Sequence, residues 1–137
     1  MKRIGLAILA FSSGPLGLWA TLAPRSFYDN FPAGGRHWVR LDGPYNHHLI
    51  SDFGALNMAL CALTIAALVL LTREFVLVTG VAWLLYTVPH FTYHATHLDP
   101  FGTSDKVLQL AGIGANLVIA LALVVTNATD KGRANSS

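Results

Sequence analysis

Three histidines near the end of a long apolar stretch have the spacing of a helix face. His90, His94 and His97 occupy positions i, i+4 and i+7, and at about 100° per residue these positions lie on one side of a helix. Two imidazoles at i and i+4 can bind one ion together, and imidazole is a ligand for zinc, copper and iron. The spacing therefore predicts a metal site on this face.

A carboxylate is expected at the same depth. Asp52 lies about one turn inside the preceding apolar stretch, where an unpaired charge is unfavourable, so we expect it to face a partner or a cavity. His48 precedes Asp52 by one turn on the same face. The stretches that contain Asp52 and His90 are expected to run in opposite directions, which places both side chains at similar depth. The candidate metal ligands are therefore Asp52, His90 and His94, with His48 or His97 as the fourth.

Two further polar side chains are predicted to support the site. Tyr86 precedes His90 by one turn and shares its face, and Gln109 belongs to a polar stripe of the last apolar stretch, together with Asp105 and Asn116. We expect Tyr86 and Gln109 to orient the imidazole nitrogens through hydrogen bonds, as outer partners do in metal sites.

Two alternatives to a metal ion remain open at this stage. A b-type haem would need one histidine on each of its faces, and His48 and His90 are the candidates. The histidines could also be polar residues at the membrane surface that hydrogen-bond to one another and to water. Copper, zinc and iron all accept these ligands, and the sequence does not predict whether the chain is an enzyme.

The elements that must position these residues are membrane helices. The chain is 53% hydrophobic and only 12% charged, against about 25% charged residues in soluble domains. The apolar residues form four runs, each close to the roughly 20 residues that cross a bilayer, and none of the runs alternates as barrel strands do. We predict an all-α, integral membrane, up-and-down four-helix bundle. Its helices are expected at about 4–23, 49–71, 75–95 and 107–126.

The two ends of the chain raise separate questions. The first run also resembles a secretory signal, because Lys2 and Arg3 precede it and small residues end it. Pro24, directly after that end, favours a retained first helix. Gly14 and Pro15 predict a kink or a break within this helix. We expect residues 1–126 to form a single domain and residues 127–137 to form a polar, disordered tail.

Basic residues predict the orientation in the membrane. Lys2 and Arg3 flank the first helix, and Arg73 lies in the very short connection between the second and third helices. Such residues favour the cytoplasmic side, so we predict a plasma-membrane protein with both termini in the cytoplasm. The loop at 24–48 would then lie outside, and its many aromatic residues indicate a compact cap at the membrane interface. A net charge of +2 without a basic run excludes nucleic acid as a partner.

Two segments resemble a known group of proteins. Residues 31–56, which read FPAGGRHWVRLDGPYNHHLISDFGAL, and residues 88–94, which read VPHFTYH, resemble a box found in small, uncharacterised bacterial four-helix membrane proteins. The general plan is also similar to the DoxX-like group, through size and helix count alone. Neither resemblance implies an activity.

Three functions follow as hypotheses. The leading one is a metal or redox protein with its site outside the cytoplasm. The second is a non-catalytic accessory subunit that uses its aromatic loop to dock on a larger membrane complex. The third, a proton-linked carrier that titrates Asp52, would require a homo-oligomer, because four spans are few for transport.

Overall fold

The computed structural model describes residues 2–134, with side chains described only as far as residue 127. Within this range the chain is helical and contains no strand. Four helices are long and apolar enough to cross a membrane, so the predicted all-α class with four membrane helices is confirmed. The helices are α1 (Lys2–Leu22), α2 (Pro24–Asn30), α3 (Trp38–Asp42), α4 (His47–Leu70), α5 (Arg73–Thr96) and α6 (Thr103–Ala134).

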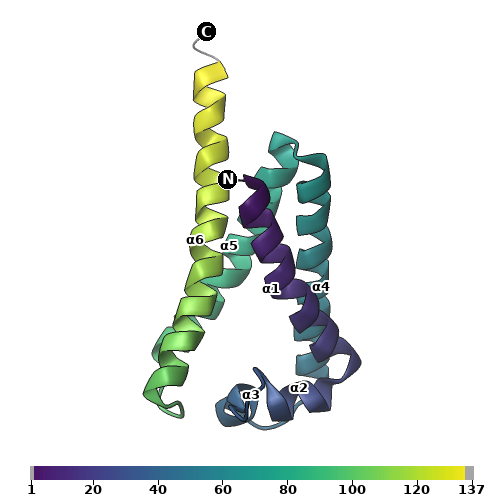
Figure 1. Ribbon diagram of the computed structural model, residues 1–137, viewed down its shortest axis with the longest axis vertical. Helices are drawn as coiled ribbons and strands as arrows, with labels where there is room; N and C mark the ends of the chain where they lie inside the picture. Colours follow the sequence, from purple (N-terminus) through teal and green to yellow (C-terminus); the bar gives the residue numbers. More distant parts are fainter. Residues whose placement is uncertain (1, 135–137) are drawn as a thin grey trace.

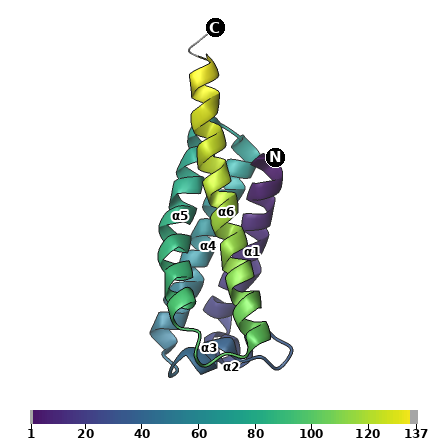
Figure 2. The same cartoon turned by 90° about the vertical axis from the view of Figure 1, so that its left-hand side faces the viewer.

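The four long helices alternate in direction (Figure 1). The start of α1 and the turn between α4 and α5 lie at one end, which we call the termini end; α2 and α3 lie at the other, which we call the loop end. Helix α1 packs along α4, and α5 packs along α6. In Figure 1 these two pairs diverge toward the loop end. Figure 2 shows α6 crossing in front of α4 and the short helices closing the loop end.

A side-chain cap begins α4, and a proline lies within α1 without breaking it. Asn46 accepts a hydrogen bond from the backbone N–H of Leu49 at 3.1 Å and so begins α4. Helix α1 is continuous from Lys2 to Leu22 with Pro15 inside it, so the possible break there does not occur. Proline is tolerated within membrane helices because neighbouring helices and side chains satisfy the freed backbone groups.

Buried side chains form two clusters, one in each half of the molecule. The cluster in the termini half is aliphatic apart from one tryptophan and consists of Leu6, Leu9, Leu60, Ala67, Val76, Trp83, Ala120 and Leu123. The cluster in the loop half joins the short helix α2 to α1 and α4 and consists of Ala20, Phe27, Tyr28 and Ile50. Aromatic side chains of the loop therefore pack inside the fold.

Helix α6 continues beyond its expected end at residue 126 and remains helical as far as Ala134. The side chain of Asn127 is fully buried, and its carboxamide oxygen accepts a hydrogen bond from Lys2 Nζ at 2.8 Å. Its backbone carbonyl accepts one from Arg73 Nε at 3.1 Å. Because contacts from α1 and α5 hold this residue, the helix does not end where the apolar run ends. The prediction for residues 135–137 lies outside the described residues.

Candidate functional site

His90 and His94 lie next to each other on α5 in the loop half of the molecule. Their ring centroids are 4.8 Å apart, with an angle of 70° between the ring planes. The His90 ring also stacks against Tyr86 of the same helix, at 5.3 Å, and against Phe53 of α4, at 6.2 Å. The structure therefore brings together two of the four predicted metal ligands and holds one of them by aromatic stacking.

Asp52 does not join this pair, which corrects the expectation that it faces His90. Its side chain is 63% exposed, and its carboxylate lies 3.3 Å from Nε2 of His48, one turn earlier on α4. The adjacent residue, Phe53, occupies the position against His90. Asp52 lies at about the level of His90, as predicted, since the next residue contacts His90. Its side chain, however, faces His48 and not His90.

The rotation of α4 about its axis is determined by its contact with α1. A Cβ atom on Gly54 would lie 2.6 Å from the backbone nitrogen of Thr21, and one on Gly17 would lie 2.9 Å from the Gly54 carbonyl oxygen. Only glycine permits backbones to approach this closely. Asp52 precedes Gly54 by two residues, which is about 200° around a helix, so the glycine contact turns Asp52 away from the interior.

His97 lies beyond the last helical residue of α5 but stays close enough to His94 to act on it electrostatically. The last helical residue is Thr96, and His97 has a non-helical backbone with φ of −125°. Its ring stacks on the exposed Tyr93 at 4.2 Å. The helical spacing predicted for His90, His94 and His97 therefore holds for the first two, while the third falls one residue outside the helix.

These positions leave the predicted four-ligand set unassembled. Among residues 2–127, no three or more His, Cys, Asp and Glu side chains gather closely enough to hold a metal ion. The two histidines considered for haem are also separated, because the His48 side chain is 87% exposed while His90 lies between Phe53 and Tyr86. A site at His90 and His94 would need donors of other types.

Gln109 of α6 supplies such donors. Its side chain is only 3% exposed and lies beside His94. Neither of its polar atoms has a hydrogen bond of normal geometry to a described residue, and neither has Nδ1 of His94, although the Gln109 amide lies close enough to His94 to act as its hydrogen-bond partner. A buried polar group without a partner costs about 1–3 kcal/mol. These groups can be satisfied by each other after a small movement, or by water, an ion or a ligand held between them.

Tyr86 is tied to α4 by a residue that we did not single out from the sequence. Asn57 is 3% exposed, and its amide donates to the Tyr86 hydroxyl at 3.2 Å and to the Phe53 carbonyl at 2.9 Å. Asn57, like Asp52, is a polar residue within an apolar run, and such a residue needs a partner. That signal was present in the sequence.

The loop between α1 and α4 contacts both helix pairs. Phe27 packs against Phe53 of α4 at 5.8 Å. Toward the other pair, Arg36 forms an ion pair with Asp105 of α6, and the Tyr93 hydroxyl donates to Asp42 at 3.3 Å. The loop therefore bridges the loop end, where the two pairs diverge.

The loop also carries polar and cationic groups, and one of them, Asp42, lies near His94. Asp42 lies close enough to His94 to act on it electrostatically, and Nε1 of Trp38 is buried without a partner among the described residues. Arg25 donates to Asp29 at 2.7 Å and lies over the Tyr45 ring at 4.9 Å. The hydrogen bond and the charge of Asp29 raise the pKa of the Arg25 guanidinium, so this group stays cationic.

The length and hydropathy of the four long helices indicate a multi-pass helical membrane protein. No family model, curated protein or solved structure matches this chain. The resemblance to small bacterial four-helix membrane proteins and to the DoxX-like group therefore stays a prediction, and any function must be argued from the residues themselves.

Proposed function

We propose that the chain binds one transition-metal ion through His90 and His94, in the loop half of the membrane domain, with the Gln109 amide oxygen as a further donor. The observation that carries this proposal is that the buried amide of Gln109 and Nδ1 of His94 lie side by side without a hydrogen bond of normal geometry to any described residue. Buried polar groups are rarely left without a partner. An ion that accepts nitrogen and oxygen donors would satisfy these atoms together.

The small number of protein ligands shapes the expected chemistry. Structural zinc sites are closed by four protein ligands, whereas sites that act on a substrate keep at least one position open. Two imidazoles and one amide leave such positions for water or a substrate. Imidazole suits copper, zinc and iron alike, and electron transfer follows only if the ion is copper or iron.

The location of the site follows from the orientation that the basic residues favour. We place both termini in the cytoplasm of a plasma-membrane protein, because Lys2, Arg3 and Arg73 all lie at the termini end. His90 and His94 then belong to the half of the membrane that faces away from the cytoplasm. Cysteines introduced at Ser104 and, separately, at Glu74, in a background with Cys61→Ala, test this orientation. An impermeant maleimide applied to intact cells is expected to label only the first.

Elemental analysis of protein purified in detergent without chelators tests the metal proposal. We expect about one metal ion per chain in the wild type, since the paired imidazoles form one site. His90→Ala and His94→Ala are expected to lose the metal, and Gln109→Leu to bind it more weakly. His48→Ala and His97→Ala are the matched controls and are expected to retain it, because the His48 side chain is 87% exposed and the His97 ring stacks on Tyr93 beyond the end of the helix.

Two results would overturn the proposal. A metal content that is equal in all four histidine variants would show that the ion binds elsewhere. A metal-free wild type that takes up no copper, zinc or iron on addition would leave the accessory-subunit hypothesis in its place. That hypothesis is then tested by co-purification of a partner from the native membrane, with Trp38→Ala and Tyr45→Ala expected to release the partner.

A further inference from the structure

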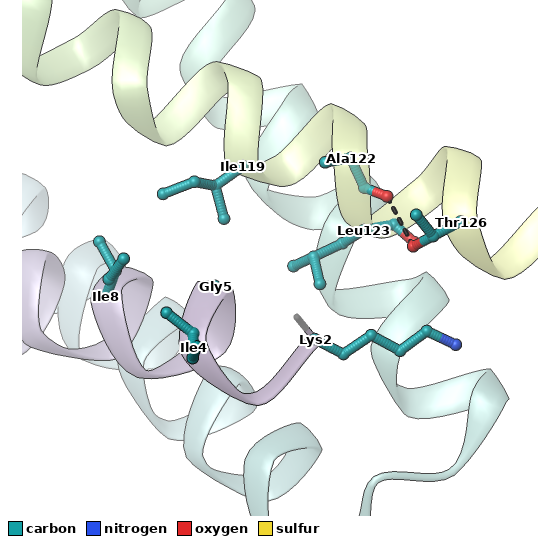
Figure 3. A pocket seen from close by; sticks show the side chains of 8 residues that line it. All are labelled: Lys2, Ile4, Gly5, Ile8, Ile119, Ala122, Leu123 and Thr126. Carbon is teal, nitrogen blue, oxygen red and sulfur yellow. Dashed lines mark hydrogen bonds between the residues drawn. The ribbon is translucent and has the colours of Figure 1, made fainter.

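A groove between α1 and α6 opens at the termini end of the molecule (Figure 3). Its lining is apolar except at one end, and consists of Lys2, Ile4, Gly5, Ile8, Ile119, Ala122, Leu123 and Thr126. Gly5 brings the two helices together at its base, because a Cβ atom there would lie 3.0 Å from the Ile119 side chain. In Figure 3 the isoleucines of α1 and Ile119 of α6 face the groove from opposite sides.

Lys2 lines one end of the groove, and Arg73, which is not part of the lining, contacts the same residue of α6 as Lys2 does. Lys2 Nζ donates to the Asn127 carboxamide at 2.8 Å, and Arg73 Nε donates to the Asn127 backbone carbonyl at 3.1 Å. A single residue of α6 thus holds the first residue of α1 and the first residue of α5. Helices α1 and α5 both begin here, so we expect these charges at the boundary between hydrocarbon and lipid headgroups.

We propose that this groove binds one anionic phospholipid, with an acyl chain between α1 and α6 and its phosphate at Lys2 and Arg73. The walls along α1 extend from Lys2 to Ile8, which is about 9 Å of helix and suits the first part of an acyl chain. Basic residues at a membrane surface attract anionic headgroups by about 1 kcal/mol each. The groove thus combines an apolar channel with positive charge at the correct depth for a lipid.

A second groove on the same molecule provides an internal comparison. It lies between α1 and α4 and is lined by Gly14, Leu18, Met58, Cys61, Ala62 and Ile65. Its lining is apolar and includes no charged side chain, and it lies midway along both helices. Lipid chains that contact this surface gain no electrostatic preference, so it serves as the control for apolar contact alone.

Native mass spectrometry of the full chain, released from micelles with defined lipids, tests the proposal. Phosphatidylglycerol and phosphatidylcholine with identical acyl chains are the probes. The wild type is expected to retain one phosphatidylglycerol roughly tenfold or more tightly than phosphatidylcholine. Lys2→Gln and Arg73→Gln are expected to reduce this preference by about fivefold each. Ala122→Phe, which fills the groove, is expected to weaken retention of both lipids.

Matched variants separate the groove from general effects of charge and size. Arg3→Gln removes a neighbouring exposed charge, and Ala62→Phe fills the uncharged groove; both are expected to leave the preference unchanged. Equal retention of the two lipids by the wild type would overturn the proposal without reliance on any variant. A preference for phosphatidylglycerol that survives Ala122→Phe would also overturn the proposal. So would a lipid-free dimer that Ala122→Phe dissociates, because a second copy of the chain would then occupy the groove.

Discussion

The two halves of the membrane domain bury different kinds of side chain. In the termini half, the Trp83 indole donates to the Thr64 hydroxyl at 2.8 Å, and Thr64 donates to a backbone carbonyl of its own helix. Thr79 is the only residue of that half whose buried side chain lacks a partner among residues 2–127. In the loop half, Trp38, His94, Gln109 and Thr21 all keep such atoms.

This difference separates a half whose packing stabilises the fold from a half in which we propose a binding site. The termini half has an aliphatic cluster in which α1, α4, α5 and α6 all take part, and such packing stabilises a helical membrane protein. In the loop half the helix pairs diverge and buried polar groups go unsatisfied, which costs stability. Polar groups inside a membrane protein commonly mark functional positions. Variants in each half should therefore differ in their effect on stability.

The largest effect is expected in the termini half. Trp83 is 1% exposed at the centre of the aliphatic cluster, so Trp83→Ala should lower the free energy of unfolding by about 4 kcal/mol. Leu85→Ala, at a position that is 74% exposed, should change it little. Unfolding in sodium dodecyl sulfate, followed by circular dichroism, measures both. Similar losses in the two variants would argue against a stabilising core in this half.

A smaller loss is expected where α1 and α4 touch. Gly54→Val would place atoms against the backbone of Thr21, and such overpacking should lower the free energy of unfolding by about 2 kcal/mol. The neighbouring Ala55 is exposed, so Ala55→Val is the control and should be nearly neutral in the same titration. If Gly54→Val were equally neutral, the glycine contact could not be what determines the rotation of α4.

Two buried amides in the loop half should respond in opposite directions. Gln109→Leu removes a buried amide that has no hydrogen bond of normal geometry and should raise the free energy of unfolding of metal-free protein by about 1 kcal/mol. Asn57→Leu removes an amide that is bonded to Tyr86 and Phe53 and should lower it by about 1 kcal/mol. Equal losses in the two chelator-treated variants would remove the observation that supports the metal site.

The smallest effect is expected at Asp52, which the sequence predicted to be a metal ligand. Asp52 and His48 form an exposed pair one turn apart, and such pairs contribute less than about 0.5 kcal/mol. Asp52→Asn should therefore leave both the free energy of unfolding and the metal content nearly unchanged. A loss of metal in this variant would show that Asp52 is a metal ligand, and would contradict the observation that Asp52 faces away from His90.

The sequence was sufficient to predict the four long helices, though not the short helices α2 and α3, because the hydropathy of a run of about 20 residues does not depend on its neighbours. The four long helices follow the apolar runs closely. The depth of His90 relative to α4 could also be predicted, since a short turn makes the two helices antiparallel and fixes which residues lie level. His90 and His94 share a face because the helical period requires it.

Only the tertiary structure decided which face of each helix is inside. In lipid, apolar side chains cover the inner and the outer surface alike, so hydropathy does not distinguish Asp52 from Phe53 by direction. The close contact of Gly17 and Gly54 with their opposing backbones made that choice. Contacts between distant segments likewise decided that α6 continues past Asn127 and that Gln109 of α6 lies beside His94 of α5. Such contacts depend on the packing of whole helices, which no local sequence pattern records.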